Sequence, residues 1–481
     1  MTYEVVVVGG GIGGLTIAAL LSKRGVKVCL LERQPEVGGC ISSVQHHGLT
    51  FDPGFGLYSG WESGAIFDRI FTELGGARPD VGPLPDEVVI RLNGLDIALR
   101  KDGSFNDELR RVFPGSAERA VEFYSTVERI AGELKRLSAV GPIAPKSIFS
   151  KALAVIRATR SESELLAQAR HTPAANYLKE TSDQFVSFID AQLRLFLQTP
   201  VAECPFLSAC VVLNRLRENL YSIAGGPSAL TECLAASLKS SGGTLKLNTP
   251  VLRLAYGNGG DAIGVDLLSG ERVIATRAIV SNMTIWDTYG KLVGLNRTPP
   301  EVKKYLNLLG SSGVYQVFAS LQKTALERLP GERMLVVGDP PGDQFFFSTM
   351  DAADEPNLGV TFTSLTEVDD WFSFQPDEED ADRRDQEALE VFWNKLHQSI
   401  PEFGGDIEVL ETATPKSYYE QTRRKLGLVM GYRQPASASS NPISQLLPNL
   451  FMIGDTATDG IASLESIALS ALQLANTLQP K

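Results

Sequence analysis

Near the start of the chain, residues 5–15 read VVVVGGGIGGL, a run of four valines that leads directly into a cluster of glycines. A secretory signal peptide needs basic residues before its apolar run, whereas only Met1–Glu4 precede this one. A membrane-spanning helix needs about 20 apolar residues, and glycine is a poor helix former. The stretch therefore predicts a buried strand, a tight turn and the start of a helix.

The spacing of the glycines is typical of a dinucleotide-binding βαβ unit. Val5–Val8 are β-branched and apolar, as in a strand buried on both faces of a parallel sheet. Gly9, Gly11 and Gly14 supply the pattern G-x-G-x-x-G, with Gly13 in the same loop. The first glycine permits the turn, the second lets the backbone approach a diphosphate, and the third allows helix and strand to pack closely. The N-terminus of the helix then faces the phosphate charge.

A second strand and an acid complete the unit. The helix expected over residues 15–24 ends at Gly25, and residues 27–32 form a strand that ends on Glu32. Glu32 follows Gly14 by 18 residues, near the spacing at which an acid binds the ribose diol of a dinucleotide. This order of elements predicts an adenine dinucleotide site; the alternative is a glycine-rich turn without a ligand.

Composition limits the class of protein. The chain has 481 residues, 43% hydrophobic and 21% charged, which suits a globular protein of two or three domains. The net charge of −12 argues against nucleic acid as a partner. Five cysteines without a C-x-x-C pair predict free thiols in a reducing compartment. The one close histidine pair, His46–His47, is a poor chelate because neighbours on a strand point to opposite faces, so we expect no metal site.

The same glycine pattern serves NAD and FAD, so other segments must decide between them. We find no second nucleotide fold in the sequence, because the glycines at 257–260 lie in a predicted hairpin turn and Gly54 and Gly56 do not follow a buried strand. Three further segments favour FAD. They are residues 32–54, residues 225–282, and the stretch from Asn449 to the C-terminus.

Together these segments resemble the flavin-dependent amine oxidase superfamily, and within it the branch of phytoene desaturases, carotenoid isomerases and retinol saturases. The matching segments cover residues 1–60, 220–290 and 410–478. The resemblance implies FAD as the cofactor. The cofactor-binding residues that it and the glycine pattern imply are Gly9, Gly11, Gly13, Gly14, Glu32, Arg33, Gly38, Gly39, Cys40, Val251, Gly454, Asp455, Ile461, Ser463 and Leu464.

Several of these roles rest on the resemblance alone. Many relatives carry an arginine after the pair Gly38–Gly39, where this chain has Cys40. The chain therefore lacks the positive charge that this arginine would bring to the phosphates. In this respect the chain is nearer to the isomerases and saturases than to the desaturases and amine oxidases. Cys40 is either a small buried residue or a redox-active thiol. The resemblance also implies that the Val251 backbone pairs with adenine, that Asp455 binds the ribityl hydroxyls, and that Ile461–Leu464 lie beside the isoalloxazine.

The last helix, expected from about Ser463, is apolar nearly all round, so we expect it to be buried. Its N-terminus presents a positive dipole end and free N–H groups, which favour the negative charge of a reduced flavin. Glu465 lies near this end and is either a proton donor or acceptor with a raised pKa, or a structural residue. We assign no side chain as catalytic.

We predict an α/β fold in which discontinuous segments build a Rossmann-type FAD-binding domain that carries an inserted α+β substrate domain. The FAD-binding segments are 1–60, 221–284 and 411–481, and the substrate domain takes 61–220 and 285–410.

Residues 135–160 hold six basic residues and no acid. They form either an amphipathic helix that docks on a membrane at the mouth of a lipid-substrate tunnel, or an ordinary surface helix. We expect a cytoplasmic protein, with the membrane surface as a further point of contact under the first interpretation.

Four functions are consistent with these features. The first is an FAD-dependent oxidoreductase that desaturates, isomerises or saturates an apolar polyene by hydride exchange with flavin N5, with oxygen or a quinone as electron acceptor. The second is an amine or amino-acid oxidase that uses Tyr418, Tyr419 and Arg423. The third is another small-molecule flavin oxidoreductase of secondary metabolism. The fourth is a flavin-free lipid-binding protein, as the Rab GDP-dissociation inhibitors are on a related fold.

Overall fold

The computed structural model describes residues 1–84, 87–139, 164–338, 342–350, 356–372, 378–433, 447, 449–457 and 463–479. Contacts divide the chain into two compact units. The first combines Met1–Leu84, Tyr221–Arg333 and Phe346–Lys481, and the second combines Pro85–Leu220 with Met334–Phe345. The first unit therefore collects all three segments that predict a cofactor site, together with most of residues 285–410. The functional division into an FAD-binding and a substrate domain stays a prediction.

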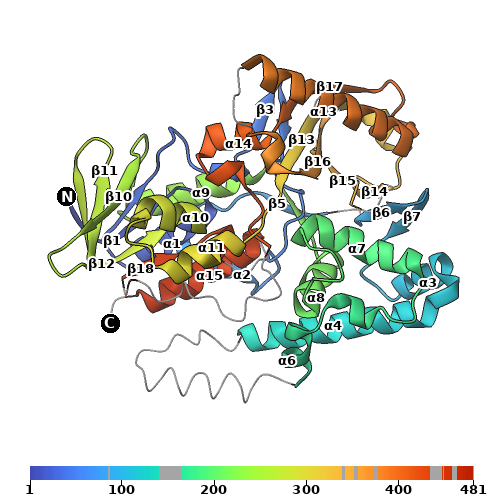
Figure 1. Cartoon of the computed structure of the whole chain (residues 1–481), viewed down its shortest axis with the longest axis horizontal. Coiled ribbons are helices and arrows are strands. Elements are labelled where there is room, and N and C mark those ends of the chain that lie inside the picture. Colours follow the sequence, from blue (N-terminus) through green and yellow to red (C-terminus); the bar gives the residue numbers. More distant parts are fainter. Residues whose placement is uncertain are drawn as a thin grey trace. The chain divides into compact units, whose positions relative to one another are not determined.

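The first unit is organised around a seven-stranded sheet in the order β10-β11-β12-β1-β2-β9, with β18 also paired to β12 (Figure 1). Its strands are β1 (Thr2–Val8), β2 (Val28–Leu31), β9 (Thr244–Lys246), β10 (Val251–Tyr256), β11 (Ala262–Leu267), β12 (Arg272–Ser281) and β18 (Leu450–Met452). The pairs β1–β2, β2–β9, β1–β12 and β12–β18 are parallel, whereas β10–β11 and β11–β12 are antiparallel.

One strand differs from the pattern in the sequence. The sequence predicts two short strands here, Val273–Ala275 and Ala278–Val280, whereas the structure joins them in a single strand, β12. The strand is irregular at the predicted break: Tyr3 pairs with Ala275 and Val5 with Ala278, so two residues of β12 lie opposite one residue of β1.

Both faces of β1 are buried, as its run of valines predicts. Val5 and Val7 pack into a core with helices α1 (Ile12–Lys23), α2 (Ile66–Leu74), α9 (Pro227–Ser240) and α15 (Leu464–Thr477). Val6 and Val8 pack into a second core with residues of β11, β12, the turn Thr288–Gly294 and α11 (Pro300–Leu308). Burying an aliphatic side chain stabilises a fold by about 1.5–3 kcal/mol, so the two cores fix the strand at whose end the glycine loop begins.

The first unit also contains a second group of strands. Strands β17 (Ile407–Ala413), β13 (Gly313–Gln322), β16 (Asn357–Thr366) and β15 (Gln344–Met350) follow one another in that order. The hairpin of β3 (Val44–His46) and β4 (Leu49–Phe51) packs on this group, since Phe51 contacts Phe318 of β13 with ring centroids 5.4 Å apart. A shorter pair joins β5 (Val81–Pro83) to β8 (Tyr221–Ile223). The remaining helices of this unit are α10 (Ile285–Asp287), α12 (Lys323–Leu326), α13 (Glu378–Ser399) and α14 (Pro415–Thr422).

The second unit is mainly helical. It contains α3 (Ser104–Val112), α4 (Ala117–Ala139), α6 (Glu164–His171), α7 (Asp183–Leu197) and α8 (Phe206–Arg215), with strands β6 (Val89–Leu92), β7 (Leu95–Ala98) and β14 (Arg333–Val337). Its core is aromatic: Phe113 packs edge-on against Phe185, and Tyr177 stacks on Phe206. The basic patch expected around Lys146, Lys151, Arg157 and Arg160, with its apolar face Ile148, Phe149, Ala152, Leu153 and Ile156, lies outside the described residues.

Candidate functional site

Three parallel strands of the first unit end at the same edge of the sheet, and the candidate site is built there. Gly9 follows β1, Asn282 follows β12, and Gly454 lies two residues after β18. The Asn282 N–H donates to the Val8 carbonyl at 2.8 Å, which ties these chain ends together. The carboxyl edge of a parallel sheet is where such folds bind ligands, so the fold itself selects this position.

The glycine loop leaves no room for side chains. Gly9 has a φ of +101°, a conformation that favours glycine. A Cβ on Gly14 would lie 2.1 Å from the Gly9 carbonyl oxygen, and one on Gly11 would lie 2.8 Å from Asn282 Nδ2. A Cβ on Gly13 would lie 2.7 Å from Asn282 Oδ1 and 3.0 Å from Ile467 of α15. The loop therefore keeps its backbone open towards a ligand, as a diphosphate cradle requires.

A second glycine pair lies beside this loop. The Gly38 N–H donates to the Gly10 carbonyl at 2.9 Å, and Gly38 forms an isolated parallel bridge with Gly11. Gly38 and Gly39 have φ angles of +121° and +65°. The structure thus brings Gly38 and Gly39 against the glycine loop, although 24 or more residues separate them from Gly14 in the chain.

Glu32 points into the same region. Its Oε2 accepts from the Gly10 N–H at 2.5 Å, and its Oε1 accepts from the Gln34 N–H at 2.8 Å. The Thr249 N–H donates to the Glu32 carbonyl at 2.7 Å, which places the start of β10, and with it Val251, near this acid. An acid at the end of the second strand fits the ribose of an adenine dinucleotide.

Arg33 has a different orientation from Glu32. Its Nη2 donates at 2.7 Å to the carbonyl of Gln421, in the last turn of α14. The structure therefore links Arg33 to the C-terminal end of α14, and its predicted cofactor role stays a prediction.

Asp455 forms a buried ion pair that the sequence did not reveal. Its Oδ2 accepts from Arg424 Nη2 and from the Gly431 N–H, the latter at 3.2 Å. The two side chains are only 13% and 14% exposed. Arg424 Nε also donates to the Leu428 carbonyl at 2.7 Å. No sequence signal links Arg424 to Asp455, because the two residues are 31 positions apart and belong to no shared motif.

Cys40 lies next to this ion pair. It packs against the small apolar cluster of Val314, Tyr418 and Val429. Burial raises the pKa of the Cys40 thiol, Arg424 opposes this rise, and Asp455 adds to it. Cys40 is partly buried, and its raised pKa favours the protonated thiol.

A polar loop, residues 52–58, is fixed in place from several sides. Tyr58 Oη donates to Asp52 Oδ2, and the Gly54 N–H donates to Asp52 Oδ1 at 2.7 Å. Arg333 Nε donates to the Gly56 carbonyl at 3.1 Å. Burial raises the pKa of Asp52, against the opposing effects of its two hydrogen bonds and of Arg333. The carboxyl group, the tyrosine and the arginine thus form one buried network.

Gln316 extends this network to α14. Its Nε2 donates to the Pro53 carbonyl and to Thr363 Oγ1, both at 2.8 Å, and its Oε1 accepts from Tyr418 Oη. Gln316 is fully buried, and Tyr418 is 5% exposed. Burial raises the pKa of Tyr418, with smaller contributions from Cys40 and Asp52. The sequence marks the loop around Gly54 by its glycines, but it gives no sign that Gln316 and Tyr418 are buried against it.

Tyr418, Tyr419 and Arg423 do not form a shared substrate cage. Tyr418 is directed to the buried Gln316, whereas Tyr419 packs edge-on against Phe372 with ring centroids 5.7 Å apart. Arg423 is exposed and lies over the Tyr419 ring at 5.1 Å. The arrangement expected for an amine or carboxylate site from these three residues is therefore wrong, because successive residues of α14 point in different directions.

The N-terminus of α15 completes the site. Ser463 caps it and accepts from the Ser466 N–H at 3.1 Å, and Leu464 is its first residue, partly buried against the main core. Glu465 Oε2 accepts from Ser59 Oγ, so this acid holds the end of the 52–60 segment. Ile461 lies outside the described residues. The helix is buried along Ile467, Ala468, Ala471, Leu472 and Ala475, which confirms the prediction.

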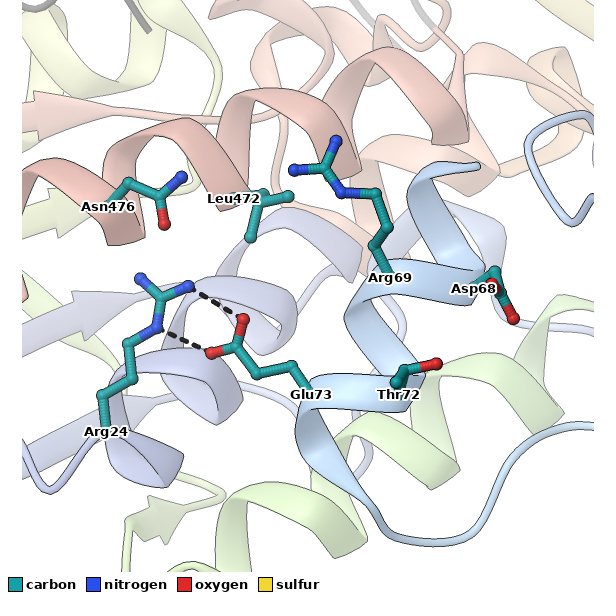
Figure 2. Close-up of a pocket in the computed structure, with 7 residues that line it drawn as sticks. All are labelled: Arg24, Asp68, Arg69, Thr72, Glu73, Leu472 and Asn476. Carbon is teal, nitrogen blue, oxygen red and sulfur yellow. Dashed lines mark hydrogen bonds and ion pairs between the residues drawn. The ribbon is translucent and has the colours of Figure 1, made fainter. Parts of the chain in front are cut away.

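A surface hollow of about 360 Å³ lies at the other end of α1, about 18 Å along the helix from the glycine loop. Its lining residues are Arg24, Asp68, Arg69, Thr72, Glu73, Leu472 and Asn476 (Figure 2). Arg24 makes two bonds to Glu73, at 2.7 and 3.0 Å, and Asp68 pairs with Arg78 at 3.0 Å. The Arg24–Glu73 pair joins the end of α1 to α2, whereas the Asp68–Arg78 pair joins α2 to the segment that follows it. Among the residues that the structure describes, no group of three or more His, Cys, Asp or Glu side chains gathers to hold a metal ion.

The fold and the glycine cradle define a dinucleotide-binding flavoprotein. The chain belongs to the flavin containing amine oxidoreductase family, whose sequence profile matches residues 12–474. FAD is the cofactor of this class of oxidoreductase, and the residues present fit it: a Cβ on Gly11, Gly13 or Gly14 would lie within 2.8 Å of a neighbouring atom, and Glu32 accepts from the Gly10 N–H. The chain is therefore an FAD-dependent enzyme.

Similar proteins indicate the branch of the family to which the chain is related. Prolycopene isomerase from Daucus carota is 24% identical over 98% of this chain and 79% of the relative. All-trans-retinol 13,14-reductase from Danio rerio is 27% identical over 67% of this chain and 55% of the relative. Cyclohexylamine oxidase from Brevibacterium oxydans has the same fold, with a TM-score of 0.63 and 16% identity over 99% of this chain and all of that one. The predicted resemblance to the carotenoid and retinoid branch is confirmed.

None of the described helices combines the length and the apolar character that a membrane span requires.

Proposed function

We propose that this enzyme acts on an apolar, conjugated polyene of the carotenoid or retinoid type and isomerises, saturates or desaturates its double bonds. The observation that carries the proposal is the similarity to prolycopene isomerase across 98% of the chain. The similarity to a retinol reductase supports the same substrate class, because both relatives are named for conjugated isoprenoids.

The polar side chains around the site support an apolar substrate. Asp52 is engaged by Tyr58, and Tyr418 by Gln316. These groups satisfy one another, as buried polar groups must, so they hold the loop 52–58 rather than offer an ion pair to a small amine. A polyene needs shape and orientation more than polar recognition.

Bound FAD supplies hydride exchange with an allylic carbon of the substrate. The chain's own residues hold and tune this cofactor. The glycine loop and Glu32 would hold its adenosine diphosphate half, and the N-terminus of α15, capped by Ser463, would favour negative charge on the reduced ring. The network of Asp52, Tyr58 and Arg333 keeps the facing loop in one conformation.

For desaturation, we infer that the two electrons leave to oxygen or a membrane quinone; saturation needs an electron donor that reduces the FAD, and isomerisation returns the hydride to the substrate. The described residues contain one dinucleotide cradle, the loop at Gly9–Gly14, and FAD occupies it in this family. A lipid-soluble substrate and acceptor both suit a reaction at a membrane surface, so the assay includes lipid.

The test is to incubate the purified protein with prolycopene or all-trans-retinol in liposomes, once with its FAD oxidised and once with its FAD reduced by dithionite, and to separate the products by chromatography. We expect a new isomer, or a product changed by two hydrogens, that depends on bound FAD. The same preparation is offered putrescine and cyclohexylamine in a hydrogen peroxide assay as the matched control. Peroxide from an amine, together with unchanged polyenes, would refute the proposal.

A further inference from the structure

A buried arginine takes a position beside the cofactor cradle. Arg424 follows α14, and α14 packs against the turn Gly39–Ile41. Its guanidinium pairs with Asp455 and lies near the thiol of Cys40, the residue directly after Gly39. Gly39 in turn approaches the Cα of Gly11 in the glycine loop, since a Cβ built on it would lie 3.7 Å from that atom.

The guanidinium keeps its charge in this position. Burial opposes the charge of Arg424, but the attraction of Asp455, with Cys40 and Asp287 contributing, outweighs it and raises the pKa of Arg424. Its side chain is only 14% exposed, so the charge is weakly screened by solvent. A permanently charged, planar donor of this kind is the side chain best suited to phosphate oxygens.

The neighbouring cations serve other contacts. Arg423 is exposed over the Tyr419 ring, and Lys425 Nζ lies 5.2 Å from the Trp286 ring centroid. Arg33 donates to the Gln421 carbonyl. Of these four cations, Arg424 is the one that the fold directs to Cys40 and Asp455.

We propose that Arg424 supplies the positive charge that faces the FAD diphosphate, in the place of the arginine that this chain lacks after Gly39. Asp455 holds the guanidinium in position through Oδ2, and the Leu428 carbonyl fixes its Nε. The guanidinium of Arg424 thus takes the role that an arginine side chain at position 40 would have. The inference rests on the cofactor of the family and not on the identity of the substrate.

The experiment compares the dissociation constants of FAD and riboflavin on flavin-free protein, measured by flavin fluorescence. Riboflavin lacks phosphate, so it reports the isoalloxazine pocket alone. We expect Arg424→Gln to weaken FAD about 10- to 100-fold and to leave riboflavin within about twofold, because a charged hydrogen bond is lost. Arg423→Gln removes the same charge one residue away, and we expect it to change neither constant.

Two further variants keep the test decisive. Arg424→Gln leaves Asp455 buried without its partner and can unfold the protein. Arg424→Gln/Asp455→Asn buries no net charge. It is compared with Asp455→Asn alone, which accounts for any lost contact to the ribityl chain, and it should bind FAD more weakly than that variant and riboflavin equally well. Adding Cys40→Arg to Arg424→Gln should restore part of the FAD affinity. The proposal is overturned if FAD and riboflavin weaken equally, if neither weakens, or if Cys40→Arg restores nothing. Polyene turnover enters none of these measurements, so the proposed substrate is tested separately.

Discussion

Replacing Gly14 by alanine tests whether the glycine loop is a close-approach site. The new methyl group would lie 2.1 Å from the Gly9 carbonyl oxygen, which is 0.9 Å inside the 3.0 Å that real contacts respect. The obstacle is backbone, so β1 and α1 have to move apart. Such overpacking costs about 3 kcal/mol, and alanine returns about 1 kcal/mol in helix propensity. We expect a net loss of about 2 kcal/mol.

The matched control is Gly132→Ala in α4. Gly132 is exposed, and a Cβ built on it meets nothing within 4 Å. The same substitution should therefore stabilise by about 0.5–1 kcal/mol. The assay combines thermal unfolding with flavin absorbance per mole of protein. We expect Gly14→Ala to unfold about 4 °C lower and to lose its flavin, and Gly132→Ala to do neither. A Gly14→Ala protein with full flavin and an unchanged midpoint would refute the reasoning.

Three further predictions concern buried polar groups. Burial raises the pKa of Asp52, so the unfolded chain releases this proton first and stability falls as pH rises from about 4 towards the folded pKa. Asp52→Asn should lack that slope when thermal midpoints are compared across pH. Tyr418→Phe leaves the buried Gln316 Oε1 without its donor, and we expect a loss of about 1–3 kcal/mol in thermal unfolding. Burial raises the pKa of the Cys40 thiol, so iodoacetamide should label it far more slowly in the folded than in the unfolded protein, as measured by peptide mass spectrometry.

Each of these three measurements has a contradicting result. The first is a parallel pH profile for the wild type and Asp52→Asn. The second is an unchanged unfolding midpoint for Tyr418→Phe. The third is labelling of Cys40 at the rate of a free thiol. Any of them would contradict the burial on which that prediction rests.

The sequence predicts the glycine loop well because the determinants are local. Val5–Val8 favour a doubly buried strand, and Gly9, Gly11 and Gly14 favour one turn, so a few adjacent residues define both element and site. The pair Gly38–Gly39 is also predictable, since glycines mark places where backbones approach. The sequence does not show that the two strands predicted within residues 273–280 join in β12, because strand continuity depends on its partners β11, β1 and β18, which lie elsewhere in the chain.

The charges of the site are less predictable for the same physical reason. Arg424 and Asp455 become partners only when α14 and β18 are brought together by the fold, and Arg333 meets Gly56 across more than 270 residues. A single arginine or glutamine in a sequence carries no sign of its future burial. Burial decides its role, because an ion pair at the surface contributes little to stability, whereas one in the interior produces a large local electric field.

The local glycines and the distant buried side chains have different roles in the site. The glycine loop provides space and backbone N–H groups, which any dinucleotide can use, and its position follows from the sheet alone. Four buried side chains fix the loop 52–58 and the charge around that space: Asp52, Arg333, Gln316 and Arg424. None of them belongs to the glycine motif. Cys40 links the two kinds of determinant. Under the proposal for Arg424, a small side chain suffices after Gly39 because another segment supplies the charge.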